Sequence, residues 1–329
     1  MKAIQFDRFG GPEVLELVEI ERPSPGPGEV LIRVGAAGVN FFEVLMRQDR
    51  YAVTPALPFR PGVEVAGTVE ALGDGVDEFR IDQRVAAALF IGSTSGGGYA
   101  EYVVASQEIV APLPDAVSFA EATALLVQGL TALHLLRQNP PAGKTVLVNA
   151  AAGGVGSLLM QLARRSGAAR VIAAASSAEK LELARRLGAD AGVDYTQADW
   201  PERVRAANGA AGPDLVFEAS GGEITAASLV LLAPFGRLVL YGPLAIQDFR
   251  PGAAEVQALI FGNLSLRGFA LLPLLRADRI KAELGELFEL AARGALRPLV
   301  GGSYPLQRAN EAHAALESRR STGKVVLAP

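Results

Sequence analysis

The sequence predicts an α/β protein with two domains, a doubly wound parallel sheet and a smaller β-barrel. Three observations lead to this prediction. A chain of 329 residues, of which 50% are hydrophobic, is too long for one ordinary domain. Short Val-rich segments between Gly/Pro turns fill the chain up to about residue 115. From about residue 118, strand and helix patterns alternate, as in a parallel sheet covered by helices.

The first part is expected to form short strands at 14–20, 30–34, 63–72 and 99–105. Turn sequences separate them: RPSPGPGE precedes the second strand, LGDG follows the third and STSGGG precedes the fourth. Regular strands with such turns predict a barrel-like all-β domain.

The second part opens with a predicted helix at 119–138, which Pro140 and Pro141 end. Buried strands are then predicted at 145–148, 170–175, 192–195, 215–219 and 237–241, with an edge strand at 264–269. The helices between them are predicted at 154–166, 178–187, 201–207 and 224–233. The tail adds predicted helices at 277–293 and 307–319 and a last strand at 324–327.

Composition and charge exclude several classes of function. Lys and Arg total 31 against 35 Asp and Glu, and a net charge of −4 gives no electrostatic reason to bind nucleic acid or anionic membrane. The chain has 0 cysteines, which excludes disulfides, thiolate metal ligands and a catalytic Cys. The N-terminus has no apolar core of a signal peptide, and no apolar run approaches the roughly 18 residues of a membrane span. We therefore expect a soluble cytoplasmic protein.

A glycine-rich turn, NAAAGGVG from residue 149, follows a predicted strand and opens an amphipathic helix. It matches a Gly-x-Gly-x-x-Gly fingerprint at Gly153 and Gly156, with Ala151 in the first position and Gly154 and Val155 between the two glycines. The second glycine lets a pyrophosphate approach the backbone, and the helix N-terminus supplies N–H groups and a positive dipole end. The turn therefore predicts a dinucleotide site, and the alternative is a purely structural corner.

The end of the second strand predicts which dinucleotide binds. An NAD site expects a carboxylate there to hold the ribose 2′-OH, but the strand ends in Ala175, Ser176 and Ser177. The next carboxylate is Glu179, already within the helix, and Lys180 is placed to meet a 2′-phosphate. The strand end therefore favours NADPH, with a solvated helix face as the alternative for Lys180.

Several further motifs, in order along the chain, resemble one known family. They are GVNFFEVLMRQDRY (38–51), PGVEVAGTVEALGDGV (61–76), GGYAEYVVA (97–105), QGLTALHLL (128–136), AAAGGVGSLLMQLAR (150–164), LGADAGVDY (187–195), FEASGG (217–222) and ESRRSTGKVVL (317–327). The chain resembles the zinc-free medium-chain dehydrogenase/reductases, the NADPH:quinone oxidoreductases. This resemblance implies a GroES-like catalytic domain at 1–120 completed by 271–329, a Rossmann NADPH-binding domain at 121–270, and a homodimer that pairs Rossmann sheets.

The resemblance also implies site residues. Asn40 and Thr131 would contact the nicotinamide, with a strand-end turn and an ordinary helix position as their alternatives. The backbone that would close over the nicotinamide is that of Tyr241, Gly242, Phe269 and Leu271, with plain strand ends as the alternative. The 2′-phosphate would be held by Lys180, Tyr195 and Arg319. The alternative for Tyr195 is packing within a strand, and the alternative for Arg319 is an ordinary position on a surface helix.

The chain departs from the family pattern near the substrate. Relatives carry a Tyr five residues after the Asn, where this chain has Leu45, whereas Tyr51 matches a Tyr that ends the same segment. Asn40 and Tyr51 are then the main polar candidates of the pocket. The proton that completes a reduction would come from solvent or from Tyr51, whose alternative role is packing.

A catalytic zinc is not expected. The zinc-dependent relatives carry Gly-His-Glu where this chain has Gly62, Val63 and Glu64. Zinc needs about three protein ligands, and the only histidines, His134 and His313, lie in predicted helices in different parts of the chain. We therefore predict no metal site and a structural role for Glu64.

Hydride transfer to a quinone or an activated C=C needs proximity, alignment and a dry cleft, and no nucleophile or strong base. The sequence thus favours an NADPH-dependent quinone or enone reductase. Two alternatives stay open: an enoyl-thioester reductase on the same scaffold, and an NADPH-binding protein with a structural or regulatory role and little turnover.

Overall fold

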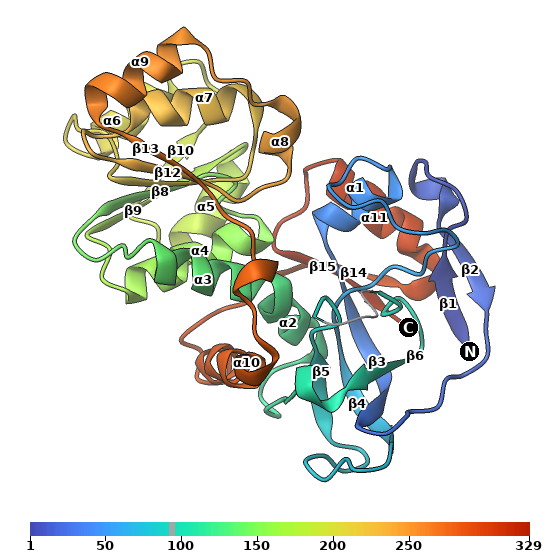
Figure 1. Ribbon diagram of the computed structural model, residues 1–329. Coiled ribbons are helices and arrows are strands. Elements are labelled where there is room, and N and C mark those ends of the chain that lie inside the picture. Colours follow the sequence, from blue (N-terminus) through green and yellow to red (C-terminus); the bar gives the residue numbers. More distant parts are fainter. Residues whose placement is uncertain (92–95) are drawn as a thin grey trace. The chain divides into compact units, whose positions relative to one another are not determined.

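The structure is a computed structural model that describes residues 1–91 and 96–329. It divides into two compact units, one of Met1–Leu130 with Leu272–Pro329 and one of Thr131–Leu271 (Figure 1). We call them the barrel unit and the dinucleotide unit. The predicted boundary at 120 differs from the division at residue 130 because the helical segment that begins at Phe119 starts in the barrel unit. The predicted turn at 93–98 lies partly outside the described residues.

The barrel unit is built mainly on antiparallel strands. They are β1 (Lys2–Gln5), β2 (Glu16–Glu19), β3 (Glu29–Val39), β4 (Val65–Leu72), β5 (Arg84–Ala87), β6 (Tyr102–Ser106), β7 (Val110–Pro112), β14 (Val300–Pro305) and β15 (Lys324–Ala328). The main sheet has the order β14-β15-β3-β4-β5-β7, with β6 also paired to β3. β1 pairs with β2, and an isolated bridge joins its Ala3 to Ala100. The C-terminal strand β15 lies between β14 and β3, so the tail completes this unit.

Several barrel strands differ from the prediction. The strand predicted at 30–34 is the longer β3, which continues through small residues to Val39. A Cβ on Gly35 would lie 2.4 Å from the Phe119 ring, so this glycine allows the strand to pack closely against Phe119. The structure also contains β1, β5, β7 and β14, which were not predicted. In β14, a Cβ on Gly301 would lie 1.5 Å from the Thr322 carbonyl oxygen, so this glycine marks a close backbone approach.

The helices of the barrel unit are α1 (Phe41–Arg47), α2 (Phe119–Ala124), α10 (Ala277–Ala292) and α11 (Ala309–Glu317). The prediction did not include α1, and it placed the end of α11 at Arg319 instead of Glu317. The predicted helix at 119–138 is three pieces: α2, a π-helical turn at Leu125–Gly129, and α3 (Leu130–Gln138). The barrel core joins N-terminal strand residues such as Val30 and Val65 with tail residues such as Leu306 and Val325.

The dinucleotide unit carries a parallel sheet. Its strands are β8 (Thr145–Val148), β9 (Arg170–Ala175), β10 (Ala191–Asp194), β11 (Leu215–Glu218), β12 (Arg237–Leu240) and β13 (Ser265–Gly268). Their order is β10-β9-β8-β11-β12-β13, all parallel, which is the order 3-2-1-4-5-6 of a Rossmann fold. This confirms the predicted fold class, and each predicted strand of this sheet agrees with the structure to within a residue.

Helices cover both faces of this sheet. They are α4 (Gly154–Arg165), α5 (Ala178–Arg186), α6 (Trp200–Ala207), α7 (Gly222–Leu231), α8 (Leu244–Asp248) and α9 (Ala253–Gly262). Figure 1 shows α7 and α9 on one face and α3 and α4 on the other. The prediction did not include α8 or α9. β8 and β11 are the two central strands of the sheet, and the chain continues from them toward opposite edges of the sheet. The point where the strand order reverses therefore lies at the end of β8, where the glycine turn begins.

The segment Phe119–Gln138 is long and apolar enough to cross a membrane by length and composition, so the prediction that no run approaches that length is wrong. In the fold, however, 72% of its most apolar window is buried inside the protein, which is typical of a core helix. It is the one such segment among the described residues.

Candidate active site

The glycine turn leaves the end of β8 and enters α4. The Ala151 N–H donates to the Ala174 carbonyl of β9 at 3.0 Å, so the turn is tied to the neighbouring strand. Ala150, with φ of 50°, is the residue in the left-handed conformation, and Ala151 is fully buried. Alanine is therefore tolerated in the first fingerprint position because the strained backbone lies one residue earlier.

The two glycines of the turn have different physical roles. A Cβ on Gly156 would lie 2.5 Å from the Ala150 carbonyl oxygen, so this glycine is required for the close approach of α4 to the turn. Gly153 is the N-cap of α4 in an extended conformation, with φ of −75° and ψ of 174°. A Cβ on Gly153 would meet only the Ala150 oxygen, at 3.1 Å, so a side chain there would extend over the helix N-terminus without entering the fold.

The N-terminus of α4 is suited to an anion. Its first turn, Gly154 with Val155 and Gly156, carries no acidic residue, and within the described chain no side chain caps its N–H groups. The last turn carries Arg164 and Arg165, which match the negative end of the helix dipole. The first-turn N–H groups are consequently donors in need of an acceptor.

The end of β9 lies beside this turn in the sheet. Ser177 caps α5, since its Oγ accepts the Lys180 N–H at 3.3 Å. The Lys180 Nζ lies 3.4 Å from the Ser176 Oγ, and burial lowers the pKa of Lys180. Tyr195 follows β10, with its N–H bonded to the Ala175 carbonyl at 3.2 Å. Ser176, Lys180 and Tyr195 thus lie at the carboxyl ends of two adjacent strands.

Further predicted residues lie at the same edge of the sheet, because carboxyl ends of parallel strands meet there. Tyr241 and Gly242 follow β12, and the Tyr241 N–H donates to the Glu218 carbonyl at 3.1 Å. Phe269 follows β13, its N–H bonded to the Leu240 carbonyl at 2.8 Å, and Leu271 is the last residue of this unit. Thr131 lies in the first turn of α3 and is 7% exposed.

The prediction missed a buried polar cluster beneath this edge. The fully buried Glu218 carboxylate accepts the Gly221 N–H at 2.8 Å and the Thr225 hydroxyl at 3.1 Å, and it bonds the Asn149 amide. Burial raises the pKa of Glu218, and both burial and that carboxylate raise the pKa of Tyr241. The available signal was Glu218 followed by ASGG, because two glycines with positive φ need a side chain that orders their loop.

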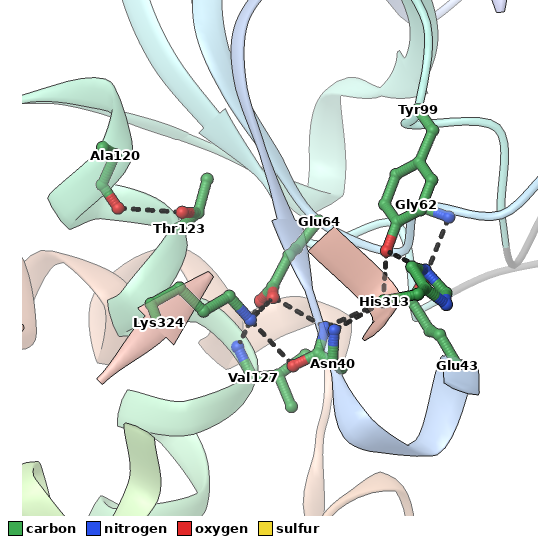
Figure 2. Close-up of polar contacts among 10 residues, drawn as sticks. All are labelled: Asn40, Glu43, Gly62, Glu64, Tyr99, Ala120, Thr123, Val127, His313 and Lys324. Carbon is green, nitrogen blue, oxygen red and sulfur yellow. Dashed lines mark hydrogen bonds and ion pairs between the residues drawn. The ribbon is translucent and has the colours of Figure 1, made fainter. Parts of the chain in front are cut away.

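In the barrel unit, Asn40 caps α1 and is only 4% exposed (Figure 2). Its amide Nδ2 donates to Glu64 at 2.7 Å and to Glu43 at 3.2 Å, and its Oδ1 accepts the Lys324 ammonium at 2.8 Å. Both amide hydrogens are therefore used within the protein. The amide of Asn40 is therefore held on both sides by charged side chains.

The carboxylate of Glu43 lies at the centre of a second buried group (Figure 2). It accepts the Asn40 N–H at 3.0 Å, the Gly62 N–H at 2.9 Å and the Tyr99 hydroxyl at 3.3 Å. Tyr99 in turn lies 3.3 Å from the His313 Nε2. Burial raises the pKa of Glu43 to about 7, with the charge of Glu64 as a further cause, and burial lowers the pKa of His313 to about 3.

Two predicted residues of the barrel unit stand apart from this network. The Tyr51 ring packs against Phe42 with centroids 5.5 Å apart, and partial burial raises the pKa of its hydroxyl. Packing against Phe42 is thus part of the role of Tyr51. Arg319 is exposed and lies two residues beyond the end of α11 in a left-handed conformation, with φ of 56°.

Both units match known families. Residues 26–115 match the family described as the alcohol dehydrogenase GroES-like domain, and residues 154–289 match the family described as zinc-binding dehydrogenase. A quinone oxidoreductase of Pseudomonas aeruginosa is 36% identical over 100% of this chain and 99% of its own length. The chain belongs to the quinone oxidoreductase family.

Solved structures agree with this membership. The quinone oxidoreductase of Thermus thermophilus, solved also in complex with NADPH, has 41% identity and a TM-score of 0.84, with 100% of both chains covered. The quinone oxidoreductase of Escherichia coli complexed with NADPH has 31% identity and a TM-score of 0.89, again with 100% of both chains covered. The predicted family resemblance is confirmed, as is the GroES-like and Rossmann composition of the fold.

This quinone oxidoreductase family member matches a domain described as zinc-binding, so its possible metal ligands matter. Among the described residues, no group of three or more His, Cys, Asp or Glu side chains could hold a metal ion. His313 is fully buried against Tyr99, and His134 lies in α3. Glu64, at the position of the zinc relatives' Gly-His-Glu, is fully buried and paired with Lys324.

Proposed function

We propose that this protein is an NADPH-dependent reductase that transfers a hydride to a quinone or another activated C=C, without a metal. The main support is the carboxyl edge of the Rossmann sheet. An uncapped helix N-terminus follows the glycine turn, and Lys180 takes the place of the carboxylate that NAD sites use. We also propose a cytoplasmic location, since the one described segment apolar enough for a membrane span packs as a core helix.

The residues present fit the dinucleotide. The open face of Gly153 and the first-turn N–H groups of α4 would hold the pyrophosphate. Ser176, Lys180 and Tyr195 would hold the 2′-phosphate. A charge-assisted bond to phosphate favours the ammonium form of Lys180 and opposes the effect of its burial.

At the reacting end, NADPH supplies the hydride from its nicotinamide ring when bound. The Asn40 Oδ1 would accept a hydroxyl of the nicotinamide ribose, and Thr131 would contact the nicotinamide. The backbone around Tyr241–Gly242 and Phe269–Leu271 would exclude water from one face. The proton that completes the reduction would come from solvent or from the Tyr51 hydroxyl.

A panel of acceptors tests the proposed function. NADPH consumption is followed against quinones, enones and enoyl thioesters, and the products are identified. Turnover with quinones or enones supports the proposal. Turnover confined to enoyl thioesters would replace it with a thioester reductase, and NADPH binding without oxidation by any acceptor would indicate a structural or regulatory role.

Metal removal is expected to leave activity unchanged. The physical reason is the absence of a ligand set: the sequence has 0 cysteines, and the described residues hold no cluster that could bind a metal ion. NADPH oxidation is measured before and after dialysis against a chelator, together with the zinc content of the purified protein. Stoichiometric, tightly bound zinc would contradict the proposal.

We further propose a homodimer formed through the dinucleotide unit. β13 is an edge strand, and α9 is an apolar helix in which no residue is buried. Exposed apolar side chains gather on these two elements: Val256 (47% exposed), Ile260 (66%), Phe261 (78%) and Leu266 (38%). A patch of this kind needs a partner surface.

The variant Ile260→Glu/Phe261→Glu is expected to convert the dimer to a monomer, because it places two charges in the proposed interface. Sedimentation velocity of wild type and variant measures the change. Ile81→Glu, at an exposed apolar residue of the barrel unit, is the control and is expected to leave the mass unchanged. A monomeric wild type would refute the dimer.

A further inference from the structure

We infer that Glu64 is a positioning residue for hydride transfer, and that its single carboxylate holds two active-site segments in register. The inference rests on the proposed function, because those segments carry Asn40 and precede Thr131. The sequence predicted only a structural role for Glu64.

The carboxylate of Glu64 joins three parts of the barrel unit (Figure 2). Its Oε1 accepts the Asn40 Nδ2 at 2.7 Å and pairs with the Lys324 ammonium from β15. Its Oε2 accepts the Val127 N–H at 2.8 Å. One side chain, just before β4, thus fixes the cap of α1, the C-terminal strand and the helical segment after α2.

The bond to Val127 has a specific cause. Val127 lies in the π-helical turn Leu125–Gly129, where the α-helical pattern of hydrogen bonds is interrupted. Glu64 supplies an acceptor to this turn and so fixes where α3 begins, and Thr131 is the second residue of α3. A shift of the carboxylate would therefore move the start of the helix that carries Thr131.

The Lys324 ammonium completes the arrangement. It bonds both Glu64 and the Asn40 Oδ1, so the three side chains form a closed set that fixes the amide of Asn40. Glu64 and Lys324 are both fully buried. A Cβ on Gly38 would lie 2.4 Å from the Glu64 Oε1 and 2.5 Å from the Lys324 Cε, so this glycine leaves room for the pair.

A purely stabilising role does not account for this pair. Replacing a buried ion pair by apolar side chains is often neutral or favourable for stability, because both charges are desolvated on folding. What such a pair provides is one fixed geometry, and a displacement of about 1 Å in a catalytic group can cost about a hundredfold in rate. Glu64 contacts Asn40 and the turn that precedes Thr131, so a displacement of Glu64 would move residues of the proposed site.

The test replaces Glu64 with Gln, which keeps the shape but leaves one oxygen for three donors. We expect kcat for NADPH oxidation to fall about a hundredfold at saturating NADPH. Binding of adenosine 2′,5′-bisphosphate, which lacks the nicotinamide, is expected to stay unchanged because its site lies in the dinucleotide unit. The ratio of NADPH affinity to bisphosphate affinity is expected to fall about tenfold.

Two further variants separate positioning from stability. Glu64→Gln/Lys324→Met removes both charges, so its melting temperature is expected to recover relative to Glu64→Gln while kcat remains low. Glu70→Gln is the matched control, because Glu70 lies on β4 and pairs with Arg22 at 2.9 Å, without contact to Asn40. It is expected to keep wild-type kcat.

Wild-type kcat in folded Glu64→Gln, or a kcat that recovers together with stability in the double variant, would overturn the inference. The affinity ratio tests it independently of turnover. If the wild type binds NADPH but reduces no acceptor, the proposed function fails, and an unchanged ratio in Glu64→Gln is then the result that refutes the positioning role.

Discussion

Gly153→Val is expected to weaken NADPH binding by at least about a hundredfold while the protein stays folded. Gly153 has an extended backbone that any residue adopts, and an added Cβ would meet only the Ala150 carbonyl oxygen at 3.1 Å. The valine would instead lie over the N–H groups of α4 that the pyrophosphate needs. Losing two hydrogen bonds to a charged group, at about 1.5–3 kcal/mol each, accounts for the size of the effect.

The measurement is a fluorescence titration with NADPH, with circular dichroism and thermal unfolding as checks of the fold. Gly153→Ala is expected to have an intermediate effect because its side chain is smaller. Gly285→Val is the control, since a Cβ on Gly285 in α10 meets nothing within 4 Å. Gly156 would be a poor choice, because a Cβ there would lie 2.5 Å from the Ala150 oxygen and disturb the turn itself. Unchanged affinity in Gly153→Val would show that the turn does not bind the phosphates.

The sequence predicted the dinucleotide unit more accurately than the barrel unit. Buried parallel strands are continuous apolar runs such as VIAAA in β9, and the helices α4, α5 and α6 have a clear amphipathic period. α7 and α9 are apolar on all sides and have no such period, and only α7, which lies directly between two predicted strands, was predicted. In the barrel, β3 and β14 contain glycines that indicate a turn in the sequence but allow close packing in the fold.

The candidate site was likewise predicted well in one part and poorly in the other. The glycine turn and the strand end at Ser176 are local patterns, and the structure places both at one edge of the sheet. The network around Asn40 is not local, because Glu64 and Lys324 come from segments far apart in the chain. Only Glu43, three residues after Asn40, had a sequence signal: an Asn followed by Glu at that spacing is typical of a helix N-terminus.

Lys180→Glu is expected to reverse the coenzyme preference, for which the wild type should favour NADPH over NADH by about a hundredfold. β9 ends at Ala175 without a carboxylate, so nothing there holds a free 2′-OH, whereas the Lys180 ammonium lies beside Ser176 with an Nζ–Oγ distance of 3.4 Å. One charge-assisted contact with the phosphate is worth about 1.5–3 kcal/mol, roughly ten- to a hundredfold in binding.

The glutamate in Lys180→Glu would repel the 2′-phosphate and offer the ribose hydroxyl an acceptor, so NADPH efficiency should fall and NADH efficiency should rise. Comparison of kcat/KM for the two coenzymes measures both changes. Lys180→Met separates the loss of attraction from the added repulsion, and it is expected to remove the preference without reversing it. Arg186→Glu, an exposed position in the last turn of α5, makes the same change of charge and is expected to keep the preference for NADPH. Equal efficiencies with NADPH and NADH in the wild type would mean that the end of β9 does not select the coenzyme.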